Sequence, residues 1–298
     1  MPDTSDSGDP IATFRLTRSV AIQWVLASVV GFFALAYCFG IVLAVVRGTS
    51  LEPIVVTGTA LPDGGRWLLG ALGLLVLVVV PHELLHGVFM ARYGDSPSYG
   101  VGVSHFVLPY AYAETRGASY TRNQMLVVLL APVTVITTLG LTAMVWYPSP
   151  LLIVPLAANA AGSIGDLWMA GVLCQYPSGV RVGELPRADT QGFAVYGPGG
   201  TSVERLPGAA LLSTTVTGTV GTLAASTTVL VGLVFQSLAF GSGSLVLEPN
   251  GWILLRHELR ADGTAVLEIG GRLLAGIALG GGVTWALFTT WYSETGGS

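Results

Sequence analysis

The chain of 298 residues contains no lysine, and only 10% of its residues are charged. A soluble domain usually carries about 25% charged residues, so this composition excludes an ordinary soluble globular fold. It also excludes a nucleic-acid-binding surface, which needs a dense basic patch, because the net charge is −4. In place of charge the chain has 52% hydrophobic residues and a mean hydropathy of +0.68. This balance is typical of a protein that crosses a membrane several times.

Cysteine is also scarce. The two cysteines, Cys38 and Cys174, both lie in apolar stretches, which predicts neither a disulfide framework nor a zinc site built from thiolates. The start of the chain is polar and acidic, and the first apolar run is too long for a signal peptide, so no cleavable signal is expected. We expect residues 1–12 to form a disordered tail.

Long apolar runs are what the chain has in abundance. A bilayer needs about 20 apolar residues per helix, and six runs qualify: 19–46, 67–91, 124–147, 150–175, 209–240 and 270–292. The sequence therefore predicts an all-α polytopic membrane protein of about six transmembrane helices, with small β segments in the connecting loops. The fifth run is longer than a bilayer requires and rich in Gly, Ser and Thr, which favours tilt, a kink or close helix packing.

Three connections between the runs have a pattern of their own. Residues 92–123 are rich in aromatic residues and glycine, and they predict short strands around Pro109. Residues 176–208 are rich in proline and glycine. Residues 243–269 predict a three-strand β meander, with turns at Pro-Asn-Gly and Ala-Asp-Gly.

We expect residues 13–298 to form a single membrane-embedded domain with its core at 67–200 and the meander as an insertion. If the N-terminus is cytoplasmic, eight of the 13 arginines fall in segments inside the cell and five fall outside. Cytoplasmic loops are enriched in basic residues, so this count predicts an integral protein of the cell membrane with a cytoplasmic N-terminus.

The most specific feature is the sequence His82-Glu83-Leu84-Leu85-His86 at the end of an apolar run. Ionisable groups at membrane depth are costly and are rarely present without a function. On a helix, His82 and His86 lie at i and i+4 and project from one face, where they can bind one zinc ion. Glu83 is then left to act on a water. The alternative is a buried, hydrogen-bonded pair of histidines beside a glutamate with a structural partner.

Catalytic zinc usually takes three protein ligands, so the two histidines need a third. The fourth apolar run contains one acid, Asp166. At about 100° per residue, Asn159, Ser163 and Asp166 share one narrow face of a helix. A polar stripe in a membrane helix must face protein or water, so we predict Asp166 as the third ligand. The alternative is a polar tie between helices.

Other candidates for the third ligand are His105 and Glu114, in the loop that follows the motif. His105 fits better as a loop or gating residue. His257 and Glu258 lie in a stretch of alternating polarity, and we expect both to be solvated.

The segments Pro81–Gly94, Met125–Pro132 and Asn159–Asp166 resemble the putative zincin peptidase family of multi-pass membrane proteins, which is distantly similar to the site-2 intramembrane metalloproteases. The resemblance covers about residues 67–200 and implies proteolysis. In the site-2 pattern a glycine follows the acid, whereas here Gly165 precedes it.

The sequence thus predicts a zinc-dependent peptidase that hydrolyses peptide bonds of membrane-associated proteins or peptides. His82, His86 and Asp166 would bind Zn²⁺, and Glu83 would act as the general base. Asn159 is the candidate donor to the developing oxyanion. The bilayer and a membrane protein or peptide substrate are the expected partners. The alternatives are a non-proteolytic zinc-binding membrane protein and a pseudoprotease that only binds membrane clients.

Overall fold

A computed structural model describes residues 9–49, 54–56, 61–94, 96–103, 109–114, 117–186, 192–241 and 243–295. Within these residues the chain is mostly helical, with small antiparallel sheets. The chain forms two compact units, which we treat separately. The first unit is Met1–Arg47 with Ala71–Pro207, and the second is Gly48–Gly70 with Gly208–Ser298. The predicted domain limits stay a prediction.

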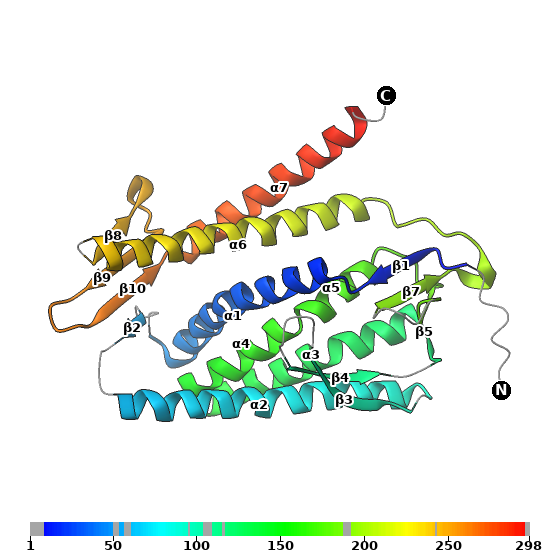
Figure 1. The fold of residues 1–298 in the computed structure, drawn as a ribbon, viewed down its shortest axis with the longest axis horizontal. Coiled ribbons are helices and arrows are strands. Elements are labelled where there is room, and N and C mark those ends of the chain that lie inside the picture. The colour runs from blue at the N-terminus through cyan, green and yellow to red at the C-terminus, as the bar shows by residue number, and fades with distance from the viewer. Residues whose placement is uncertain are drawn as a thin grey trace. The chain divides into compact units, whose positions relative to one another are not determined.

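Helices build most of the first unit (Figure 1). They are α1 (Arg18–Arg47), the part of α2 (Leu61–Arg92) from Ala71 onward, α3 (Arg122–Trp146), α4 (Ile153–Gly162) and α5 (Ile164–Leu173). At the start of α3, Thr121 and Gln124 form a capping box, in which each side chain accepts a hydrogen bond from the other's backbone N–H. Gly140 lets α3 approach α4 closely, because a Cβ there would lie 2.9 Å from Cγ of Leu156.

A four-stranded antiparallel sheet lies at the end of the first unit where α1 and α3 begin (Figure 1). Its order is β1 (Ala12–Arg15), β7 (Gly192–Tyr196), β6 (Arg181–Gly183) and β5 (Ser119–Thr121). Val182 and Val195 pair across the sheet and are buried with Leu173 of α5. Two residues of the predicted tail are paired: Ala12 opens β1, and the N–H of Ile11 donates to the carbonyl oxygen of Val195. Residues 1–8 of that tail lie outside the described residues.

The loop after α2 contains the short strands predicted around Pro109. They are β3 (Ser98–Val103) and β4 (Pro109–Glu114), which form an antiparallel hairpin in which Gly100 pairs with Tyr112. Proline lacks an N–H to donate to a ladder, which fits its place as the first residue of a strand.

The second unit joins two long helices to a second sheet. The helices α6 (Ala209–Phe240) and α7 (Gly271–Thr295) pack against each other, and the sheet has the order β2 (Ile54–Val56), β10 (Ala265–Ile269), β9 (Leu255–Leu259), β8 (Ser244–Leu247). The predicted meander and both of its turns are therefore confirmed, whereas the fourth strand, β2, was not expected. The prediction that His257 is solvated is wrong. Its side chain shares the buried face of β9 with Leu255 and is only 3% exposed, while Glu258 is exposed.

Among the described residues, five helices are long and apolar enough to cross a membrane: Arg18–Arg47, Leu72–Arg92, Arg122–Trp146, Ala209–Phe240 and Gly271–Ser293. Their outward faces carry large apolar side chains, such as Leu26, Phe33 and Leu77, each about 60% exposed. So large an apolar surface is stable against lipid and not against water. These helices match five of the six predicted spans.

The predicted fourth span, 150–175, is not one continuous helix. It is broken into α4 and α5, with the short 3-10 helix η2 (Pro150–Leu152) before α4, and the two parts meet at an angle of 42°. The break falls at Ser163, whose hydroxyl donates to the carbonyl of Asn159 at 2.9 Å. Such a bond to the preceding turn bends helices, and Gly162 beside it has a low helix propensity.

Close packing of α6 on α7 depends on glycine and is open to a direct test. A Cβ at Gly282 would lie 2.6 Å from the backbone carbonyl oxygen of Thr215, whereas a Cβ at Gly276 meets nothing within 4 Å. Gly282→Ala should therefore destabilise the protein by about 1–3 kcal/mol through overpacking. Gly276→Ala should leave the stability unchanged or raise it by up to about 1 kcal/mol. Thermal unfolding of the two purified variants in detergent compares them, and equal melting temperatures would contradict this packing.

Candidate metal centre

The motif lies in α2, immediately after Pro81, and both of its histidines point to the same side of the helix. The rings of His82 and His86 are 5.0 Å apart between centroids, with an interplanar angle of 75°. Both residues are buried, at 9% and 8% exposure. The expected i, i+4 arrangement is therefore present in an apolar surrounding.

Asp166 is brought to the same point from the first turn of α5. One of its carboxylate oxygens, Oδ2, lies 3.3 Å from Nε2 of His82 and 3.4 Å from Nε2 of His86. The three candidate ligand atoms all lie within 4.8 Å of one another. Two donor atoms on one tetrahedral zinc, at bond lengths of about 2.0–2.2 Å, are separated by about 3.3–3.6 Å. The two distances from Asp166 to the histidines have this spacing, and the three residues form a group that could hold a metal ion. The sequence-based placement of Asp166 beside the histidines agrees with this arrangement.

Nδ1, the ring nitrogen that faces away from Asp166, has a hydrogen-bond partner in both histidines. Nδ1 of His86 lies 2.8 Å from the backbone carbonyl oxygen of Val128 in α3. A carbonyl oxygen only accepts hydrogen bonds, so Nδ1 of His86 carries the proton and donates. In the neutral ring, Nε2 then has the lone pair, and this is the form of histidine that binds a metal.

Asn159 plays the same part for His82. Its side-chain N–H₂ faces the carbonyl oxygen of Pro132 at 3.5 Å, and its Oδ1 lies 3.1 Å from Nδ1 of His82. Because Pro132 offers only an acceptor, Oδ1 of Asn159 faces the imidazole and accepts its Nδ1 proton. In the neutral ring of His82, Nε2 is therefore also the nitrogen with the lone pair.

This placement bears on the role predicted for Asn159. The residue is 1% exposed, and both ends of its amide have partners. It stands behind His82, on the side away from Asp166. These contacts favour an orienting role, and the predicted role as donor to an oxyanion stays a prediction.

The remaining sequence candidates lie elsewhere. Glu83 follows His82 on α2 and is partly buried; its predicted role as base stays a prediction. His105 and the side chain of Glu114 fall outside the described part of the chain. Sequence reasoning missed the carbonyl of Val128, although a signal was present: Pro132, four residues later in the same helix, has no N–H for that carbonyl.

The β3–β4 hairpin is docked against the motif through glycine. The ring of Tyr99 in β3 occupies the space that a Cβ on Gly87 would need, directly after His86. Any larger residue at position 87 would displace Tyr99. The start of the hairpin is thus held beside the end of the motif.

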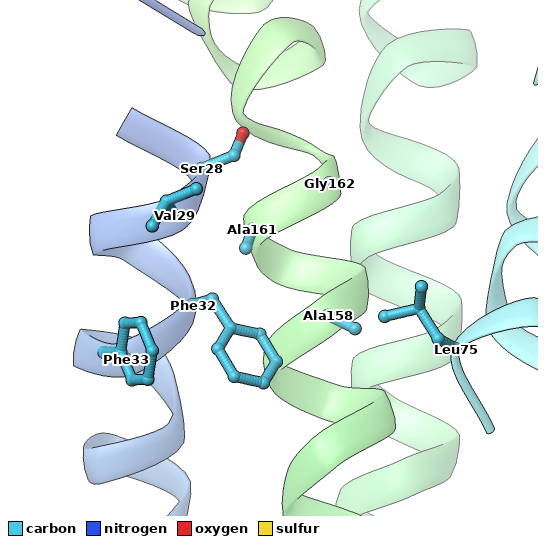
Figure 2. Close-up of a pocket in the computed structure, with 8 residues that line it drawn as sticks. All are labelled: Ser28, Val29, Phe32, Phe33, Leu75, Ala158, Ala161 and Gly162. Atoms are coloured by element: carbon cyan, nitrogen blue, oxygen red, sulfur yellow. The ribbon is translucent and has the colours of Figure 1, made fainter. Parts of the chain in front are cut away.

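A separate apolar groove of about 390 Å³ runs between α1, α2 and α4 (Figure 2). It is lined by Ser28, Val29, Phe32, Phe33, Leu75, Ala158, Ala161 and Gly162. Figure 2 shows Phe32 and Phe33 on α1, with Ala158 and Leu75 across from them. None of these residues belongs to the His–His–Asp group, so the groove is not the metal site.

Comparison with known proteins agrees with this geometry. Residues 75–181 match the model of the family described as “Putative zincin peptidase”. No curated protein and no solved structure matches the chain, and the expected likeness to site-2 proteases stays a prediction. The part of the chain that contains His82, Glu83, His86 and Asp166 is therefore similar to a family of zincin peptidases.

Proposed function

We propose that this protein is a zinc-dependent, membrane-embedded peptidase. The observation that carries the proposal is the convergence of Nε2 of His82, Nε2 of His86 and Oδ2 of Asp166. Two imidazoles and one carboxylate form a donor set of catalytic zinc, which leaves a fourth position for water or substrate. The family match supports the same chemistry.

The protein's own groups have distinct roles in this mechanism. Zinc, when bound, supplies a Lewis acid that acidifies a water and polarises the peptide carbonyl. Glu83 adjoins the ligand His82 and accepts the proton of the attacking water, then returns it to the leaving amine. Asn159 and the carbonyl of Val128 keep the two rings in their metal-binding orientation.

The substrate we propose is a peptide segment of a membrane-associated protein. A helical substrate hides its peptide bonds in its own hydrogen bonds, so it must be extended before hydrolysis. The β3–β4 hairpin lies beside the end of the motif and offers strand edges on which an extended segment can pair.

The first prediction from the proposed function tests metal binding. Asp166→Ala removes one of three ligands and should lower zinc affinity by more than about 100-fold. The matched control is Asp262→Ala, in the exposed turn before β10, which should bind zinc like the wild type. Zinc content of the detergent-purified proteins by mass spectrometry, followed by competition with a chromophoric chelator, measures both. Wild-type protein that binds no zinc would exclude the proposed function.

The second prediction separates metal binding from catalysis. Glu83→Gln keeps the size of the side chain but cannot accept a proton, so it should retain zinc and lose about 10²- to 10⁴-fold in turnover. His82→Ala should lose both properties. Cleavage of a labelled, unstructured casein in mixed micelles provides the readout. Cleavage of casein by Glu83→Gln at the wild-type rate would show that Glu83 is not the general base. Zinc binding without cleavage by the wild type on casein and on a membrane-peptide library would favour a pseudoprotease.

The third prediction concerns orientation. In the first unit, the sheet end carries Arg15, Arg18, Arg122 and Arg181. By the positive-inside rule, these four arginines support a cytoplasmic location for that end. Ser178, which is exposed between α5 and β6, should then face the cytoplasm. A Ser178→Cys variant that lacks Cys38 and Cys174 should react with an impermeant maleimide only after the cells are permeabilised. Labelling of intact cells would invert the orientation.

A further inference from the structure

The hydrogen bond behind His86 uses a backbone group that a regular helix does not offer. Nδ1 of His86 lies 2.8 Å from the carbonyl oxygen of Val128, and both residues are buried. Inside an α-helix, that carbonyl normally accepts the N–H of the residue four positions later. Something must keep that acceptor available for the imidazole.

The residue four positions after Val128 is Pro132, in the interior of α3 and fully buried. Proline has no N–H, and its ring also clashes with the carbonyl of residue i−4. The carbonyl of Val128 therefore lacks its helical donor. An unpaired buried carbonyl is costly, so a donor from another helix stabilises it. His86 is that donor.

Pro132 is also linked to His82, through a hydrogen bond to Asn159. Its own carbonyl oxygen accepts from the amide of Asn159 at 3.5 Å, and Oδ1 of Asn159 accepts the Nδ1 proton of His82. Two carbonyls of one turn of α3 therefore orient both rings. The carbonyl of Val128 accepts from Nδ1 of His86, and the carbonyl of Pro132 positions Asn159, which accepts from Nδ1 of His82. Neither backbone carbonyl belongs to a ligand.

We infer that Pro132 is a positioning residue for the metal centre: by withholding an N–H it frees the Val128 carbonyl to fix the orientation and the protonated nitrogen of His86. The inference rests on the proposed function, because it concerns the same ligands. It adds a determinant of zinc affinity that makes no contact with the metal.

The decisive variant is Pro132→Ala, which restores an N–H that competes with His86 for the Val128 carbonyl. Zinc affinity, measured by chelator competition, should fall by about 10- to 100-fold, the usual cost of losing a partner behind a ligand. The melting temperature of the zinc-free protein should stay the same or rise, because alanine favours a helix interior far more than proline does. A purely structural role for Pro132 predicts an unchanged zinc affinity and a lower melting temperature.

The matched control is Pro155→Ala. Pro155 is the third residue of α4, and the carbonyl four residues before it belongs to Leu151 in η2. That carbonyl is not the partner of either histidine, so the substitution leaves the hydrogen bonds of His82 and His86 unchanged. Its zinc affinity should equal that of the wild type. An equal loss in Pro155→Ala and Pro132→Ala would overturn the inference.

A backbone substitution separates the missing N–H from the packing of the ring. In Pro132→lactic acid, the side chain is that of alanine but an ester oxygen replaces the N–H. This variant should bind zinc within about 3-fold of the wild type, and it keeps the test valid if Pro132→Ala does not fold. A loss as large as that of Pro132→Ala would show that the ring matters, and would overturn the inference. Unchanged affinity in Pro132→Ala would do the same, whereas a wild type without zinc would refute the proposed function itself.

Discussion

Burying two imidazoles and a carboxylate among apolar helices is possible only if each polar atom has a partner, and the arrangement of the first unit follows from this requirement. The Nε2 atoms of His82 and His86 converge with one oxygen of Asp166, and a shared cation would satisfy all three of these acceptors. Their Nδ1 atoms are satisfied by Asn159 and by the Val128 carbonyl. Helices α2, α3, α4 and α5 each contribute a group, so the position of each helix is tied to the same two rings.

The break between α4 and α5 is part of this arrangement. Asn159 lies on one side of the His82 ring, at Nδ1, and Asp166 lies on the other side, at Nε2. In a straight helix the Cα atoms of these two residues would be about 10.5 Å apart along the axis. The 42° bend at Ser163 lies between these two residues, and both side chains reach the same imidazole. It also starts a new helix close to Asp166, where the positive end of the helix dipole favours a carboxylate.

Proline and glycine have specific roles in these helices. Proline removes a backbone N–H from the helix, and glycine lets a neighbouring side chain or helix approach closely. Pro132 leaves a carbonyl for His86, and Gly87 makes room for the ring of Tyr99 next to the motif. In the second unit, Gly281 and Gly282 bring α7 against the threonines of α6. Small residues at helix contacts and backbone groups paired outside their own helix are both expected where packing and hydrogen bonds, not water, hold helices together.

Local patterns in the amino-acid sequence are enough to predict several of the elements. Helical periodicity places His82 and His86 on one face, and the apolar runs predict the long helices. The turns at Pro249–Gly251 and Ala261–Gly263 predict the meander. The tertiary structure decided which distant groups meet. The pairing of β1 with β7, the addition of β2 to the meander, the burial of His257 and the place of Asn159 behind His82 all depend on contacts between segments far apart in the chain. Such contacts leave no periodic pattern, because they are set by helix packing and by the pairing of buried polar groups that packing brings together.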